Sequence, residues 1–196
     1  MQLTMAYLIL GLVLFLGVHS VRIVAEGWRQ RMRQRLGEGT WKGLYSLLAL
    51  AGLLLIVLGF AQVREQPVLL WQPPQGMRHL AALLTAVAFV LFAAAYVPGN
   101  GIKARVHHPM VAGVKLWALA HLLSNGMVVH LLVFGAFLAW AIACFAAARQ
   151  RDRAEGTVYP PGRAAATGVT VLLGLLAWAS VVFWLHGMLV GIRPLG

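Results

Sequence analysis

The sequence predicts an all-α membrane protein, a polytopic bundle of about six transmembrane helices. Two observations indicate this class. Hydrophobic residues make up 61% of the 196 residues and charged residues only 11%, whereas a soluble domain carries roughly 25% charged residues. The mean hydropathy is +0.80. Because so little of the chain is polar, we expect residues 1–196 to form a single integral-membrane domain.

Apolar runs of about 20 residues are long enough to cross a bilayer as helices. The fourth run is short and contains Lys115. Residues 110–149 could instead form one long helix, but Ser124-Asn125-Gly126 is a turn signal, since Asn or Gly readily adopts the conformation that ends a helix. We therefore expect six spans, at residues 3–21, 41–63, 77–97, 109–123, 127–148 and 165–189.

The net charge of +11 comes from 16 Lys and Arg residues against 5 Asp and Glu residues. Such a balance can indicate nucleic-acid binding, but these cations flank apolar spans, so topology and contact with anionic lipid explain them better and no nucleic-acid partner is expected. With six spans, only Arg64, Arg78 and Arg193 fall outside if the N-terminus is external. The positive-inside rule then predicts a multi-pass protein of a bacterial cytoplasmic membrane, with both termini on the periplasmic side.

The segments between the spans carry two kinds of signal. Residues 22–42 are basic and amphipathic, which fits either a solvated topology anchor or a segment lying along the membrane surface. Pro- and Gly-rich chemistry predicts loops at residues 72–76, 98–101 and 159–162.

Small residues in the spans predict close helix packing. Tyr45, Gly52 and Gly59 recur every seven residues on one helix face, and Gly187 and Gly191 form a second pair of small residues. Cys144 is the only cysteine, so no intrachain disulfide is possible, and we expect it to be a small buried residue.

A histidine inside a membrane helix is costly and is a candidate functional residue. Trp117 and Asn125 lie four residues before and after His121, so the three share one helix face. His121 could be a ligand or catalyst, or a core histidine whose hydrogen bonds Ser124 or Asn125 satisfies. His108 precedes Pro109 at a helix start, where it could be a cap or a site residue at the helix mouth.

The remaining histidines lie near the ends of predicted helices. His19 lies near the inner end of the first span, and His79, His130 and His186 lie near outer ends. Their positions alone indicate interfacial residues.

Two helical histidines that face each other across a bundle can ligate a haem iron. The chain has no C-x-x-C-H motif, which excludes a covalent c-type haem. Acidic residues are almost absent from the spans, so a carboxylate-rich metal site is not expected. No phosphate-binding loop, nucleophile elbow or dinucleotide fingerprint is present.

Several short blocks together resemble the NnrU family of bacterial membrane proteins, which is associated with denitrification and nitric oxide metabolism. The block from Trp117 to Gly126 is the most specific. The others are His19-Ser20, Gly43-Leu44-Tyr45-Ser46, His108-Pro109, Leu132-Val133-Phe134-Gly135 and Leu185-His186 with Gly191.

The resemblance implies a cofactor and its ligands. The same family includes 15-cis-zeta-carotene isomerase, a haem b membrane protein with histidine axial ligands. Carried over to this sequence, the metal ligands are His19 and His121, and His108 is the expected catalytic residue. We expect Trp117 and Asn125, on the His121 face, and His186, in the last matching block, to line the cofactor.

The resemblance leaves three functions open. The first is a haem b protein that handles nitric oxide or, as an enzyme, performs an isomerase-like reaction on a hydrophobic small molecule. The second is a non-enzymatic accessory protein for a nitrite or nitric oxide reductase. The third is a small-molecule S-methyltransferase that binds S-adenosylmethionine.

Overall fold

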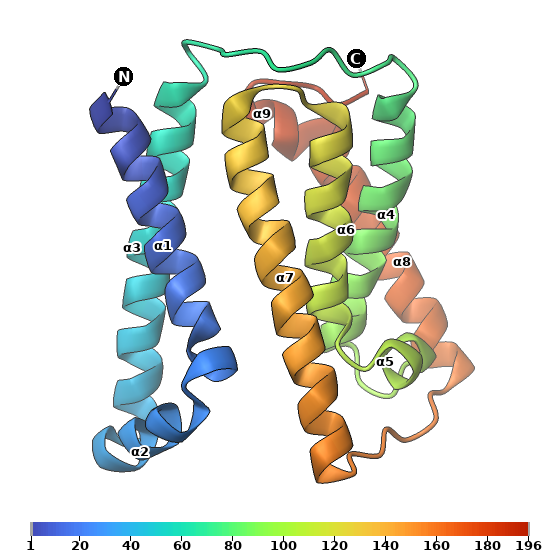
Figure 1. Cartoon of the computed structure of the whole chain (residues 1–196). Helices are drawn as coiled ribbons and strands as arrows, with labels where there is room; N and C mark the ends of the chain where they lie inside the picture. The colour runs from blue at the N-terminus through green and yellow to red at the C-terminus, as the bar shows by residue number, and fades with distance from the viewer. Residues whose placement is uncertain (1, 196) are drawn as a thin grey trace. The chain divides into compact units, whose positions relative to one another are not determined.

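The computed structural model describes residues 2–195, and its regular structure is helical (Figure 1). The helices are α1 (Gln2–Val24), α2 (Glu26–Leu36), α3 (Glu38–Val63), α4 (Met77–Tyr96), α5 (Gly101–Val106), α6 (Pro109–Ser124), α7 (Val128–Glu155), α8 (Ala164–Ser180) and α9 (His186–Val190). A π-helical turn, Val181–Leu185, joins α8 to α9. The predicted all-α fold class is confirmed.

Within residues 2–195, five helical segments are long and apolar enough to cross a membrane: α1, α3, α4, α7 and the continuous run from α8 to Val190. The sixth predicted span, α6, is apolar but has only 16 residues. At 1.5 Å per residue it extends about 24 Å, less than the roughly 30 Å of a hydrocarbon core. The described residues thus contain five helices of spanning length and one shorter apolar helix, as in a multi-pass membrane protein and close to the six spans predicted.

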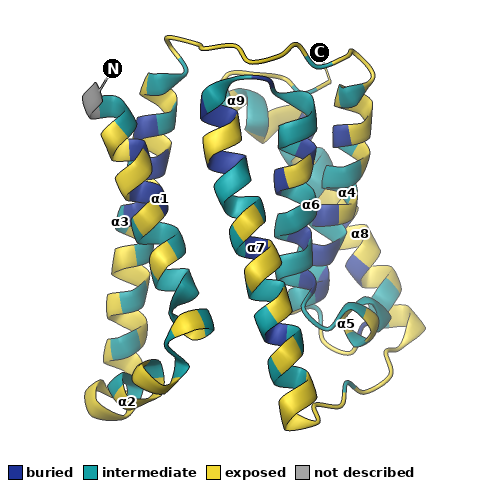
Figure 2. Ribbon diagram, in the orientation of Figure 1, coloured by how far each residue is buried: buried dark blue, intermediate teal, exposed yellow. Residues whose placement is uncertain are grey.

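The described chain divides into two compact units. The first comprises the chain up to Leu70 together with Met127–Ala136, and the second comprises Trp71–Gly126 and the chain from Phe137 onward. Buried residues in each unit lie where its helices face one another (Figure 2).

In the first unit α1 packs against α3 at glycines. A Cβ atom on Gly52 would lie 2.7 Å from the backbone nitrogen of Phe15, and one on Gly59 would lie 2.6 Å from that of Leu8. These distances are far below van der Waals contact, so only glycine permits this backbone approach. The packing role predicted from the seven-residue spacing is confirmed for Gly52 and Gly59.

The second predicted pair of packing glycines is wrong. Gly191 has φ +75° and ends α9 instead of continuing it. A Cβ atom on Gly187 would meet only the Arg193 side chain, at 3.4 Å. The pair therefore lies at the end of a helix, and a side chain at Gly187 would meet no other helix within 4 Å.

In the second unit α4 packs against α6 and α8. A Cβ atom on Gly174 would lie 2.5 Å from Cα of Val90, so α8 approaches α4 as closely as α1 approaches α3. Further along the same pair, the indole N–H of Trp178 donates to the hydroxyl of Thr85 at 3.1 Å.

Two short helices occupy segments that the sequence left as loops. Most of the basic segment 22–42 is helical: α2 carries four of its six cations, and Gly37, at φ +79°, separates α2 from α3. The turn at residues 98–101 is confirmed, but it leads directly into α5. Asn100, 2% exposed, accepts from the backbone N–H of Lys103 at 2.7 Å and donates to the carbonyl of Ala94 at 2.9 Å. This cap fixes the start of α5.

Candidate functional site

The second unit contains a polar cluster built around Asp152, the only aspartate in the chain. Its members are His107, His108, Arg149, Asp152 and Tyr159, which we call the Asp152 cluster. Nε2 of His108 lies 2.8 Å from Oδ2 of Asp152, and the Tyr159 hydroxyl donates to the same carboxylate at 3.2 Å. Nδ1 of His107 lies 3.7 Å from Oδ2. Residues far apart in sequence thus share one carboxylate.

Local backbone structure brings the two histidines to this carboxylate. His107 has φ +66°, a positive value that a non-glycine residue rarely adopts, and it ends α5. Pro109 occupies the first turn of α6, as predicted, and makes His108 the N-cap residue. The His108 side chain makes no capping hydrogen bond and contacts Asp152 instead.

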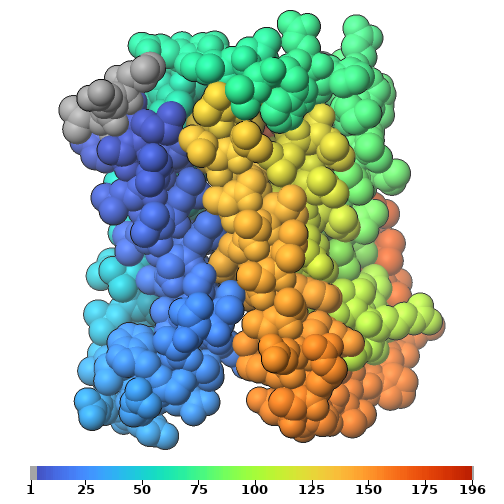
Figure 3. All heavy atoms as spheres, viewed as in Figure 1, coloured from blue at the N-terminus to red at the C-terminus, as the bar shows by residue number. Residues whose placement is uncertain are grey.

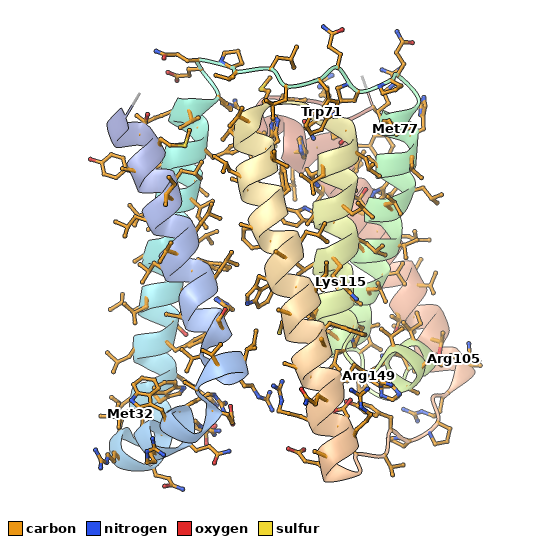
Figure 4. The ribbon with its side chains drawn as sticks, in the orientation of Figure 1. Met32, Trp71, Met77, Arg105, Lys115 and Arg149 are labelled. Carbon is orange, nitrogen blue, oxygen red and sulfur yellow. The ribbon has the colours of Figure 1, made fainter. Side chains whose placement is uncertain are left out.

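The other members come from α7 and the loop that follows it. Arg149 and Asp152 are one turn apart on α7, and an Arg149 guanidinium nitrogen donates to Nδ1 of His107. The Tyr159 ring stacks on the His107 ring, with centroids 4.0 Å apart. Lys115 of α6, labelled with Arg149 in Figure 4, lies over the ring of Phe145 of α7, 3.7 Å from its centroid. The Asp152 cluster therefore ties the ends of α5, α6 and α7 together.

The hydrogen bonds assign protons within the Asp152 cluster. An ionised carboxylate only accepts, so Nε2 of His108 carries a proton and Nδ1 holds the lone pair when the ring is neutral. Burial raises the pKa of the Tyr159 hydroxyl, and the Asp152 charge and hydrogen bond raise it further. The arrangement can accept a proton at His108 Nδ1 while Asp152 stabilises the resulting imidazolium.

His19 lies in the first unit, on the last turns of α1. Its Nδ1 is 2.6 Å from the carbonyl oxygen of Phe15, and its ring centroid is 5.3 Å from that of Tyr45. It lines an open pocket of about 380 Å³ whose lining residues come from α1, α2 and α3. Four cations line this pocket too, namely Arg22, Arg29, Arg33 and Lys42. We call it the His19 pocket; the segments that form it are the blue and light-blue part of Figure 3.

His121 lies on α6 in the second unit. Its Nδ1 is 2.8 Å from the carbonyl oxygen of Trp117, and the two rings are 5.0 Å apart. The amide of Asn125 donates to the carbonyl oxygen of His121 at 2.9 Å and to the Ser124 hydroxyl at 3.1 Å. The predicted common face of Trp117, His121 and Asn125 is present, with Asn125 bound to the backbone of His121.

His186 begins α9, directly after the π-helical turn. Its Nδ1 lies 2.7 Å from the carbonyl oxygen of Ile192, so the ring holds the turn that follows the helix. Among the described residues, no group of three or more His, Cys, Asp and Glu side chains is arranged to hold a metal ion. A metal bound to this part of the chain would need ligands of another number or kind.

Sequence reasoning missed the partners of His108 and the burial of His130. Asp152 lies between Arg151 and Arg153, a pattern typical of a solvated charged segment. The one signal that could have pointed to it is that it is the single aspartate of a strongly basic chain. His130, expected at the interface, is 8% exposed and packs against the rings of Phe60 and Phe134 in the first unit.

Comparison with protein families gives one finding. Residues 7–194 match the family described as NnrU protein. No curated protein and no solved structure matches the chain. Since the match covers nearly the whole chain, which has the apolar helices of a multi-pass membrane protein, the protein belongs to the NnrU family.

Proposed function

We propose that this protein binds haem b in a bacterial cytoplasmic membrane and acts in nitric oxide or denitrification metabolism. His19 and His121 are the proposed axial ligands, and Trp117, Asn125 and His186 the proposed residues around the cofactor. When bound, the haem would supply an iron that can bind nitric oxide.

The observation that carries this proposal is the shared hydrogen-bonding state of the two rings. Nδ1 of His19 is 2.6 Å from the Phe15 carbonyl oxygen, and Nδ1 of His121 is 2.8 Å from the Trp117 carbonyl oxygen. A carbonyl oxygen only accepts, so each Nδ1 carries the proton and each Nε2 holds the lone pair. A histidine that ligates a metal typically donates its other ring N–H in this way.

The surroundings of each ring also fit a porphyrin. The Phe15 ring is 4.3 Å and the Tyr45 ring 5.3 Å from that of His19, and the Trp117 ring is 5.0 Å from that of His121. Aromatic faces beside an imidazole offer the flat, apolar contacts that a macrocycle requires. The sequence offers neither a C-x-x-C-H motif nor a carboxylate-rich metal site, so this donor set favours a non-covalent haem over other metal centres.

His108 has a separate proposed role. Asp152 holds its Nε2 proton, so Nδ1 can exchange a proton with a substrate or with water. We propose that His108 moves protons for the reaction and does not ligate the iron.

The test is the absorption spectrum of detergent-purified protein after haem reconstitution, oxidised and then reduced. The wild type is expected to show the narrow visible bands of six-coordinate low-spin haem. His19→Ala and His121→Ala should each lose them, while His79→Ala, a change of an exposed histidine, should keep them. A wild type that stays colourless would overturn the proposal and favour an accessory protein of a nitrite or nitric oxide reductase.

A further inference from the structure

The His19 pocket carries more positive charge than its own carboxylates neutralise. Four cations line it, Arg22, Arg29, Arg33 and Lys42, and Glu38 is its only lining carboxylate. Glu38 pairs with both Lys42, at 2.9 Å, and Arg33, at 3.5 Å, so it is shared between two cations. Glu26, outside the lining, pairs with Arg29 at 2.8 Å. Against four cations there are two carboxylates.

We propose that the His19 pocket binds the two propionates of the haem, mainly through Arg33 and Lys42. This inference rests on the function proposed above and adds the residues that recognise the anionic edge of the cofactor. Two propionates supply the two negative charges that the pocket lacks.

The chemistry of the lining supports a carboxylate ligand. A guanidinium presents a planar fork of donors that matches a carboxylate, and an ammonium adds a compact charge. Both Arg33 and Lys42 are held by Glu38, which is exposed at the pocket rim. Glu38 thus occupies the donors that a propionate would use.

The pocket joins these cations to the proposed ligand. His19, Tyr45 and Trp41 line the same pocket as the cations, so an imidazole, aromatic rings and a cationic rim surround one space. A haem needs these three elements at its iron, its ring and its propionate edge.

The experiment compares haem b with its dimethyl ester, in which both carboxylates are neutral. Each is titrated into full-length apo-protein in detergent and followed by absorption. The wild type should bind haem b at least about tenfold more tightly than the ester, because charge-assisted hydrogen bonds to the carboxylates are lost. In Arg33→Gln/Lys42→Gln the two ligands should bind with similar affinity.

Two control variants distinguish loss of propionate binding from a general loss of structure. Glu38→Gln releases Arg33 and Lys42, so it should tighten haem b binding severalfold and leave ester binding unchanged, which misfolding cannot produce. Arg31→Gln/Arg35→Gln removes two exposed cations of α2 outside the pocket lining and should keep the wild-type preference for haem b. At saturation the spectrum of Arg33→Gln/Lys42→Gln should match the wild type, since His19 is intact.

Three outcomes would overturn the inference. The first is equal affinity of the wild type for haem b and its ester, with normal spectra, which leaves the haem proposal standing. The second is an Arg33→Gln/Lys42→Gln variant that keeps the preference for haem b but loses binding to phosphatidylglycerol vesicles, which would make the pocket a lipid-headgroup site. The third is no haem binding by the wild type, in which case the proposed function falls as well.

Discussion

Nε2 of His108 lies 2.8 Å from Oδ2 of Asp152, across 44 residues of sequence. This contact joins the N-cap residue of α6 to the last turns of α7, and it uses the only aspartate in the chain. Tyr159 donates to the same carboxylate, so the segment after α7 is held at the same point.

Breaking this contact should destabilise the protein through loss of a hydrogen bond to a charged group. Asp152→Ala is expected to lower the free energy of unfolding, and by more than a change of an exposed carboxylate on the same helix does. His108→Ala should cost less in the Asp152→Ala background than in the wild type, because the shared bond is already gone. The free energy of unfolding is measured in mixed micelles, by addition of a denaturing detergent, for the wild type, the two single variants and the double variant. Glu155→Ala, one turn further along α7 and exposed, should change little; fully additive effects of the two alanines would contradict the prediction.

Tyr159 should titrate above its ordinary range. Its pKa is raised from 10.0 by burial and then by the charge and hydrogen bond of Asp152. A raised pKa means that folding favours the neutral phenol. Its stabilisation is therefore complete below about pH 10 and is lost as pH rises through the folded-state pKa.

The tyrosinate absorbance of the wild type minus that of Tyr159→Phe isolates this group from the other three tyrosines. The difference should have its midpoint above 10.0, and Asp152→Asn should shift the midpoint downward. If the midpoint is the same in Asp152→Asn as in the wild type, the carboxylate does not act on the phenol.

The sequence predicted what depends on local composition. Runs of apolar residues indicated the spans, Ser124-Asn125-Gly126 the break between α6 and α7, and Pro109 the start of α6, each through a preference of the residues themselves. The Trp117, His121 and Asn125 face also followed from helical spacing alone.

The remaining features depend on contacts between distant segments. Nothing near Asp152 in the sequence indicates that His108 lies beside it, because the contact requires α6 and α7 to pack first. The His19 pocket needs residues 22–42 to be helical, whereas their charge fitted a solvated loop equally well. The Gly187 and Gly191 pair had correct spacing, but the helix ends at Gly191, where the chain adopts a positive φ.

The close approach of α1 and α3 can be tested at one glycine. Gly52→Leu should destabilise the protein by about 1–3 kcal/mol, since its side chain would collide with the Phe15 backbone. Gly43→Leu is the matched control on the same helix, because a Cβ atom there meets nothing within 4 Å. Thermal unfolding in detergent, followed by circular dichroism, compares the two. Equal melting temperatures for the variants would show that the helices do not pack through Gly52.

The positive φ of His107 allows the backbone strain at the Asp152 cluster to be separated from its side-chain contacts. His107→Ala and His107→Gly both remove the stacking on Tyr159 and the hydrogen bond from Arg149. Only glycine relieves the strain at φ +66°, so His107→Gly should be more stable than His107→Ala by about 1–3 kcal/mol. At Lys115, inside α6, the order should reverse, with glycine less stable than alanine by roughly 0.5–1 kcal/mol. Unfolding of the four variants in mixed micelles gives both differences. If alanine is the more stable substitution at both positions, the positive-φ turn at His107 does not persist in the membrane protein, and the Asp152 cluster must be held by its side chains alone.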